Sequence, residues 1–268
     1  MTRFMRWGLI LSLTPVAFAL QAWAQPFPHD IQRILQNQKI VVAMVAADNF
    51  PRLATGTNER PQEFEARLAR NIAQAFGVKA EFVRTSPTFD GVIRQVADKQ
   101  ADLGISLLTI TPHRAKMVYF STPYLTMHLA LLVNRRQRLL EQEKFPHQDI
   151  RNTTACIGVV RGSSNVLLAQ KNFRRATLKE YDSFAAELAA VQKGKCFALL
   201  DDDIIIKRFL KENPSAAVNL EIDVLQDLPD FVGIAVRPDS PHLLAWINVF
   251  LMTQGIHFTS DELLNKLK

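Results

Sequence analysis

Segments with the character of strands and helices alternate along this chain, and that alternation restricts its fold more than any other feature. Residues 39–45 are a short apolar run rich in β-branched side chains, as in a buried parallel strand. Apolar residues then recur at helical spacing over 64–76, and Gly77 follows where glycine commonly ends a helix. The alternation predicts an α/β fold, in which helices cover a parallel sheet.

The same alternation continues towards the end of the chain, with one interruption. The polar and charged stretch 135–152 interrupts it and has little apolar periodicity. Two successive α/β units therefore predict two lobes rather than one continuous sheet. We expect further strands at 79–83, 101–108, 155–160, 177–181, 196–200 and 232–236, and helices at 89–99, 164–170, 184–192, 203–212 and 243–254.

The N-terminal segment has the features of a Sec-type signal peptide. Arg3 and Arg6 precede an apolar run over 7–20, and Ala22-Trp23-Ala24 supplies small residues at both ends of a cleavage site. An uncleaved membrane anchor is the alternative, but the run is short for a membrane span and contains a proline. We therefore expect cleavage after Ala24 and export to the periplasm.

The charge pattern argues against nucleic-acid binding. The formal net charge is +6 at pH 7, and acidic and basic residues are interspersed, without a dense Lys/Arg tract. The sequence also shows no metal-ligand spacing, no phosphate loop and no nucleophile signature. We therefore expect no cofactor, no metal site and no catalytic residue, which predicts that the protein is not an enzyme.

The most informative motif lies in residues 101–124. It reads Ala-Asp at 101–102, Thr-Ile-Thr at 109–111, Arg114, and Phe-Ser-Thr-Pro-Tyr at 120–124. In this order and spacing, it closely resembles bacterial extracellular solute-binding protein family 3, the periplasmic polar amino-acid-binding proteins of ABC transporters. The resemblance continues through 64–65, 157–164, 194–203 and 231–237.

The resemblance implies a type II periplasmic-binding-protein fold, with two α/β lobes joined by two crossover strands near 124–133 and 231–236. It divides the chain into a signal peptide at 1–24, lobe 1 at 25–127, lobe 2 at 128–232 and a C-terminal part of lobe 1 at 233–268. It further implies a monomer that captures a small ligand, an amino acid by family resemblance, and passes it to an inner-membrane ABC permease.

The chemistry of such a ligand selects candidate residues. A buried amino acid needs a partner for its carboxylate and another for its ammonium. Arg114 follows a strand end and suits the carboxylate, because a guanidinium donates two parallel hydrogen bonds; Thr109 can add donors. Asp202, at a strand end in the other lobe, suits the ammonium, and Ser163 and Ser164 open a helix whose N–H groups favour a carboxylate.

Each of these assignments has an alternative. Arg114 could be a solvated arginine near a helix start, and Asp202 could simply favour the N-terminus of the next helix. Ser163 and Ser164 could form an ordinary helix cap. Phe50 and Leu107 are two further candidate ligand contacts. Because the two charge partners lie in opposite lobes, the ligand should stabilise the closed form, and hinge closure is the expected mechanism.

Two other functions remain open at this point. Some proteins of this fold are periplasmic enzymes resembling cyclohexadienyl dehydratase, which need a general acid. Here His113 and Glu65 are the nearest candidates, although their spacing does not single them out. The other alternative is a sensor that reports ligand to a membrane partner, and the sequence does not distinguish sensing from transport.

The two cysteines, Cys156 and Cys196, are predicted to form a disulfide. An exported chain meets an oxidising compartment, where a cysteine pair can form this bond. Each cysteine opens a predicted strand of lobe 2 and lies six positions before a strand-end residue, Gly162 or Asp202. Neighbouring strands would bring them within reach. The alternative is a pair of buried free thiols.

Overall fold

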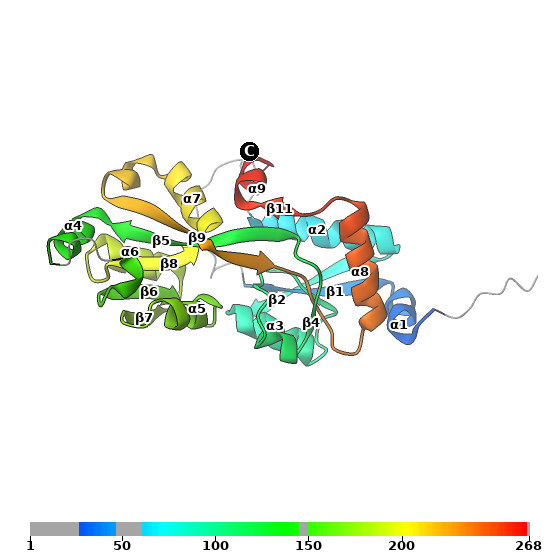
Figure 1. Ribbon diagram of the computed structural model, residues 1–268. Coiled ribbons are helices and arrows are strands. Elements are labelled where there is room, and N and C mark those ends of the chain that lie inside the picture. Colours follow the sequence, from blue (N-terminus) through cyan, green and yellow to red (C-terminus); the bar gives the residue numbers. More distant parts are fainter. Residues whose placement is uncertain (1–26, 47–60, 145–148, 267–268) are drawn as a thin grey trace, which may run out of the picture.

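The computed structural model describes residues 27–46, 61–144 and 149–266 as two α/β lobes side by side. Figure 1 shows the lobes joined by two long strands that cross between them. The predicted signal peptide and Phe50 lie outside the described residues. Within the described part of the chain, no helix is long and apolar enough to cross a membrane.

Lobe 1 is built around the first sheet. Its apolar strands are parallel at the centre, and the returning C-terminal strand β10 is antiparallel to its neighbours. The order is β2 (Lys79–Ser86), β1 (Lys39–Val45), β3 (Leu103–Gly104), β10 (Ala235–Val236) and β4 (Tyr119–Phe120). Its helices are α1 (His29–Asn37), α2 (Pro61–Phe76), α3 (Phe89–Ala97) and α8 (Pro241–Thr253).

Lobe 2 is built around the second sheet. The order is β11 (Phe258–Thr259), β5 (Leu125–Asn134), β8 (Ala198–Asp202), β6 (Cys156–Val160) and β7 (Thr177–Tyr181), and β9 (Leu220–Val232) also pairs with β5. The helices are α4 (Arg135–Lys144), α5 (Asn165–Asn172), α6 (Phe184–Gln192) and α7 (Asp203–Glu212). The C-terminal α9 (Ser260–Lys266) packs against α7 and β5 where the two lobes meet. The expected strand 177–181 and the helices 184–192 and 203–212 are confirmed with their boundaries.

The two connecting strands are β5 and β9, which run antiparallel from the Leu125–Val232 pair to the Asn134–Leu220 pair. The first crossover strand, β5, lies where the sequence predicted it, near residues 124–133. The second prediction, at 231–236, was wrong in position, because β9 ends at Val232 and extends back into lobe 2. Its first half alternates apolar and acidic residues, the pattern of a half-buried strand, and lies outside the predicted strands. The domain boundaries themselves stay a prediction.

Two other segments differ from the sequence expectations. The strand expected at 101–108 is only the short β3, and three residues beyond its end Leu107 adopts a left-handed φ of 45°. The polar stretch after Asn134 forms α4, which buries none of its residues. That helix is tied to β9 by Arg138, which pairs with Glu221 at 2.9 Å and Asp223 at 3.1 Å.

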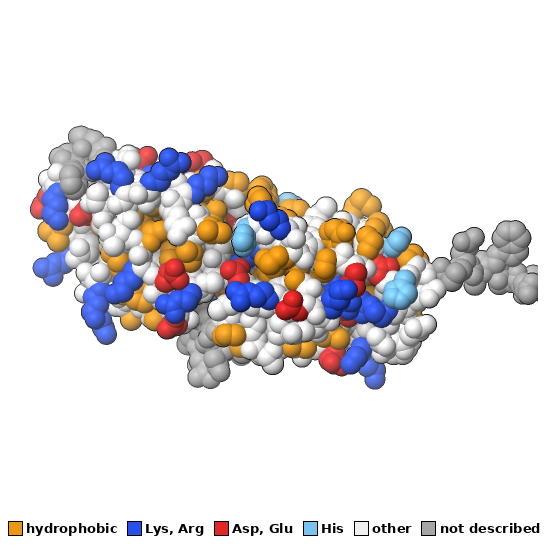
Figure 2. All heavy atoms as spheres, turned by 90° about the horizontal axis from the view of Figure 1, so that it is seen from below, with side chains coloured by type: hydrophobic (Ala, Val, Ile, Leu, Met, Phe, Trp, Pro, Cys, Tyr) orange, Lys and Arg blue, Asp and Glu red, His pale blue; other side chains and the backbone are white. Residues whose placement is uncertain are grey.

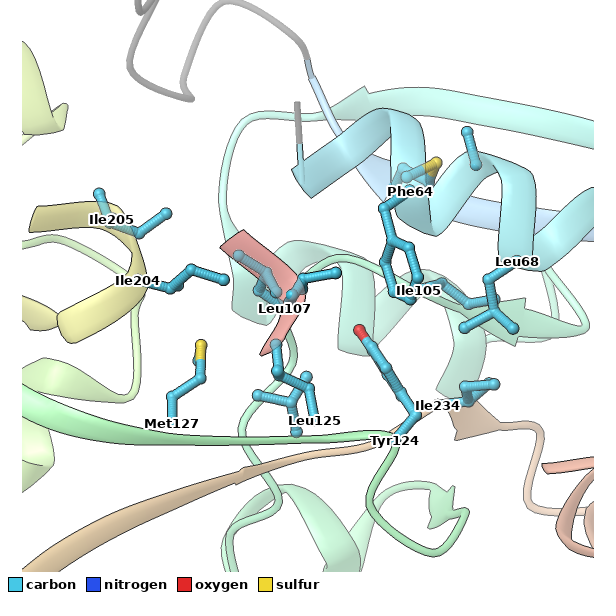
Figure 3. Packing of buried hydrophobic residues seen from close by; sticks show 14 of the residues in the cluster. Phe64, Leu68, Ile105, Leu107, Tyr124, Leu125, Met127, Ile204, Ile205 and Ile234 are labelled. Carbon is cyan, nitrogen blue, oxygen red and sulfur yellow. The ribbon is translucent and has the colours of Figure 1, made fainter. Parts of the chain in front are cut away.

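A continuous apolar cluster runs from lobe 1 into lobe 2 beneath the junction. Figure 3 shows Leu107 of lobe 1 facing Ile204 and Ile205 of α7, with Leu125 and Met127 of β5 below them. All five side chains are buried. The packing fixes the base of the region in which the two lobes meet.

The predicted disulfide between Cys156 and Cys196 is present, with a Cα–Cα distance of 4.6 Å. Cys156 opens β6, whereas Cys196 lies two residues before β8 rather than at its start. The two strands are parallel neighbours that pair Ile157 with Ala198. The bond therefore closes the end of the sheet opposite to Asp202.

Candidate functional site

A cavity lies between the two lobes, at the carboxyl ends of β6 and β8. The five residues predicted to bind ligand, together with Leu107, line one and the same cavity. Its volume is about 40 Å³, enough for a few water molecules. The lining residues are Phe89, Leu107, Thr109, Arg114, Val160, Ser163, Ser164, Asn165, Phe184, Asp201, Asp202 and Ile205.

Arg114 is buried rather than solvated, with only 3% of its side chain exposed. It begins a short 3-10 helix, and its backbone N–H donates to the Thr111 hydroxyl at 3.2 Å. Its Nε and Nη2 donate to Oδ1 of Asp90 at 3.0 and 2.9 Å, and its Nη1 donates to the Thr109 carbonyl at 3.2 Å. The alternative of a surface arginine is therefore excluded by its burial.

These bonds leave two N–H donors on the guanidinium. Arginine has five N–H groups, of which three are used here, so one N–H remains on each of Nη1 and Nη2. Two parallel N–H groups match the two oxygens of a carboxylate. Asp90 at the same time balances the buried charge, which would otherwise be costly.

Hydroxyl groups connect the lobes directly at this cavity. The Thr109 hydroxyl donates to Oδ2 of Asp230 at 2.8 Å and lies 2.8 Å from the Ser164 hydroxyl, which then acts as the donor between the two. A second link joins the backbone N–H of Asp90 in lobe 1 to the Gly162 carbonyl in lobe 2 at 3.2 Å. Two predicted ligand residues, Thr109 of lobe 1 and Ser164 of lobe 2, thus meet across the cavity.

The turn at Gly162 needs glycine. Its φ is +70°, and a Cβ there would lie 2.9 Å from Cβ of Thr88 in the other lobe. The next residue, Ser163, donates its hydroxyl to the Val160 carbonyl at 2.6 Å and its N–H to the same carbonyl at 3.3 Å. Both donors of Ser163 therefore serve the turn in this conformation, whereas the Ser164 hydroxyl faces Thr109.

Asp202 ends β8 at the cavity and does not cap the following helix through its side chain. It is 8% exposed, and its Oδ1 has no hydrogen-bond partner. Its carboxyl group shares a hydrogen bond with Asp230. Burial, followed by the charge of Asp230, raises the pKa of Asp202 well above its usual range, and burial also raises the pKa of Asp230. A cation placed against Asp202 would relieve both effects.

Sequence reasoning missed several polar residues of the site. Asp90 lies in the first turn of α3, where an acidic residue is commonplace, and so its pairing with Arg114 has no local signal. Asp230 belongs to the unrecognised strand β9. Asn165 donates to Oδ1 of Asp201 at 3.2 Å, and both residues line the cavity. Asp201 directly precedes Asp202 in the sequence, and no local pattern marks it as a second cavity residue.

The two candidate general acids lie elsewhere. His113 is exposed and does not line the cavity. Glu65 is fully buried and accepts hydrogen bonds from the Leu107 N–H at 2.6 Å and from the Tyr124 hydroxyl. Figure 3 shows the Tyr124 hydroxyl pointing towards the helix that carries Phe64. Glu65 therefore supports the backbone of the Leu107 turn instead of facing the cavity.

Other kinds of site find little support in the described ranges. No three His, Cys, Asp or Glu side chains within 27–46, 61–144 and 149–266 gather so that they could hold a metal ion. Figure 2 shows Lys and Arg side chains scattered among acidic, apolar and uncharged ones on one face of the molecule. The cavity between the two lobes is thus the candidate functional site.

Comparison with known proteins gives consistent results. Residues 41–266 match the model of the bacterial extracellular solute-binding proteins, family 3. The chain is 27% identical over 205 residues to ABC transporter arginine-binding protein 1 of Escherichia coli (strain K12), covering 76% of this chain and 80% of the relative.

Solved structures agree in fold. Arginine-bound ArgBP from T. maritima, a Gly52Ala mutant, is 27% identical, with a TM-score of 0.64 over 84% of this chain and 99% of that chain. The ancestral amino acid-binding protein AncCDT-1, described as a precursor of cyclohexadienyl dehydratase, is 25% identical, with a TM-score of 0.67 over 88% of this chain and 98% of that chain.

Proposed function

The chain belongs to the bacterial extracellular solute-binding proteins, family 3, and from that membership we propose that it captures an amino acid between its two lobes. We further propose that it does so in the periplasm, as a monomer, and delivers the ligand to an ABC permease. The match to an ABC transporter arginine-binding protein supports the role in transport. The apolar, basic-ended N-terminal segment supports export.

One observation carries this proposal: Arg114 and Asp202 line the same cavity from opposite lobes. The ligand carboxylate would take the two remaining donors of Arg114, and the ligand ammonium would take the unpartnered Oδ1 of Asp202. Thr109 and Ser164 lie between them and can exchange their mutual hydrogen bond for bonds to the ligand. Only a closed arrangement offers both charge partners, so ligand binding would favour closure.

Entry of the ligand requires the lobes to separate. A cavity of about 40 Å³ is smaller than an amino acid, and the bond from Asp90 to Gly162 holds its rim. The strands β5 and β9 are the two connections that would bend. Hinge motion about a few residues of such connections is the usual way in which two-lobed binding proteins open.

The resemblance to a precursor of cyclohexadienyl dehydratase raises the alternative of an enzyme. The positions of the acid candidates favour binding without turnover, because His113 is exposed and Glu65 does not line the cavity. Incubation with the best ligand followed by mass spectrometry should return that ligand intact. Conversion of a stoichiometric excess to product would instead establish an enzyme.

The proposal is tested by a thermal-shift screen of the twenty standard amino acids. A ligand that binds only the folded protein stabilises it by about 2.7 kcal/mol at one hundred times its dissociation constant. We expect at least one amino acid to raise the melting temperature of the wild type but not of Arg114→Ala. If none of the twenty shifts the wild type, the proposed function is wrong.

A further inference from the structure

Four carboxyl groups gather on the lobe 2 side of the cavity. Asp201 and Asp202 line it directly, and Asp230 shares a hydrogen bond with Asp202. Glu187 of α6 is completely buried in the same lobe, and neither of its carboxyl oxygens has a hydrogen-bond partner. Glu187 does not line the cavity, but burial and then the charge of Asp201 raise its pKa. The cluster therefore contains buried acceptors that nothing in the described chain satisfies.

The charges around the cavity do not balance. Among the cavity-lining residues, which all lie in the described part of the chain, Arg114 is the one cation. Asp90 already forms an ion pair with Arg114. An amino acid would add a carboxylate against Arg114 and an ammonium against Asp202. These two additions cancel each other, so the acidic surplus at Asp201 remains.

Asp201 and Asp202 cannot serve one ammonium in the same way. Successive side chains of a strand point to opposite faces of its sheet. Within β8, Leu199 packs in the cluster of Phe184, whereas Leu200 packs in the opposite cluster with Leu131. By this alternation, Asp201 lies on the α6 side of the strand and Asp202 on the other side. The end of β8 thus presents two carboxylates on opposite sides of the sheet, those of Asp201 and Asp202.

The carboxylate of Asp201 is held in place for a ligand. The backbone N–H of Asp202 donates to its Oδ1 at 2.8 Å, and the Asn165 amide donates to the same oxygen at 3.2 Å. Oδ2 is therefore the oxygen that would meet a cation. Phe184 and Ile205 line the cavity near it and suit the methylene groups of a long side chain.

From these observations we infer that Asp201 forms a second cation subsite, which binds the positively charged side chain of a dibasic amino acid. The inference rests on the proposed function, because it presumes that Arg114 and Asp202 hold the ligand backbone. Glu187 takes no direct part; it adds negative potential behind Asp201. A guanidinium or ammonium at this position supplies the missing positive charge and a donor for Oδ2 of the half-buried Asp201.

Proton exchange should accompany this binding. Burial raises the pKa of Asp201 to about 7 and raises that of Glu187 well above its usual range. The groups that face Asp201 are Asn165 of α5, Glu187 of α6, Asp202 of β8 and Asp230 of β9, none of them a cation. A ligand cation would therefore replace a proton at Asp201, and the affinity for a dibasic ligand should rise with pH up to about 7 and then level off.

Calorimetry with L-arginine and L-citrulline tests the inference, because citrulline has the same shape without the charge. We expect the wild type to bind arginine at least about thirtyfold more tightly, as for a buried charge pair. Asp201→Asn should reduce that ratio to within a few-fold of one, through a loss of arginine affinity that exceeds any change in citrulline affinity. Asp227→Asn, at a largely exposed aspartate of the same lobe, is the matched control and should keep the wild-type ratio.

The outcomes separate the two proposals. If citrulline equals arginine in the wild type, or if Asp201→Asn keeps the full preference, the second cation subsite is wrong. If neither compound binds and the amino acids that do bind all lack a cationic side chain, the subsite is again wrong and the proposed function stands. If no amino acid binds, the proposed function fails and this inference fails with it. Citrulline binding also reports that the variant is folded.

Discussion

Nε and Nη2 of Arg114 both donate to the same oxygen of Asp90, at 3.0 and 2.9 Å. The pair joins a buried guanidinium to a carboxylate that is 38% exposed. It neutralises the arginine and fixes the position of its guanidinium, which lines the cavity. Asp90 also binds Gly162 of lobe 2 through its backbone, so one residue of α3 contacts both the candidate ligand partner and the opposite lobe.

Asp90→Asn should destabilise the ligand-free protein. The variant leaves the guanidinium of Arg114 buried without its counter-ion, which costs about 1–3 kcal/mol after allowance for the exposure of Asp90. A ligand carboxylate then supplies the missing charge, so a saturating amino acid should stabilise the variant more than it stabilises the wild type. Chemical denaturation with and without ligand measures both effects. Equal ligand-free stabilities would contradict the prediction.

Arg114→Lys should weaken ligand binding even though it keeps the charge. Lysine lacks the planar fork, so it cannot hold Asp90 and a carboxylate through parallel hydrogen bonds. We expect a loss of about 1–3 kcal/mol in binding free energy, measured by calorimetry with the best ligand. Arg94→Lys, at an exposed position of the same region, is the control and should bind as the wild type does. An unchanged affinity of Arg114→Lys would argue against a bidentate carboxylate contact.

Glu65 should make stability depend on pH. Burial raises its pKa from 4.5 to about 7, so the folded state holds the proton more tightly than the unfolded state between these values. The free energy of unfolding should therefore fall as pH rises through this range. Glu65→Gln retains both accepted hydrogen bonds and should gain about 2–3 kcal/mol relative to the wild type between pH 5 and 8.

Denaturation at several pH values checks this prediction. Glu81→Gln, at a carboxylate whose side chain is 51% exposed, provides the control and should leave the pH profile unchanged. Parallel profiles of Glu65→Gln and the wild type would show that Glu65 does not titrate in this range. In that event the hydrogen bond that the Leu107 N–H donates to Glu65 would not depend on the protonation of Glu65.

The disulfide should contribute stability without affecting ligand binding. Its cysteines are 40 positions apart, and closing such a loop stabilises by about 4 kcal/mol in the chain-entropy treatment. The double variant Cys156→Ser, Cys196→Ser should lose stability of this order but bind the ligand as tightly as the wild type. Denaturation and calorimetry on the same samples compare the two. A large drop in affinity at full folding would place the bond in the binding mechanism.

Much of the fold and part of the candidate site could be predicted from local patterns. Helical and strand periodicity correctly gave most elements, and the family resemblance together with the strand-end rule selected Arg114 and Asp202, which line one cavity. The matching register of Cys156 and Cys196 similarly anticipated their bond. These features are local, because a strand end or a spacing of six residues is visible within one short segment.

Only the tertiary structure decided which distant side chains complete the site. The Thr109 hydroxyl meets Asp230 across 121 positions, and Arg114 meets Asp90 across 24. Neither aspartate differs locally from a surface carboxylate, since their roles arise when β9 and α3 pack beside the cavity. Burial likewise decides the protonation of Glu65, Asp201 and Glu187. Desolvation depends on everything that surrounds a group in space, and no local sequence pattern contains that information.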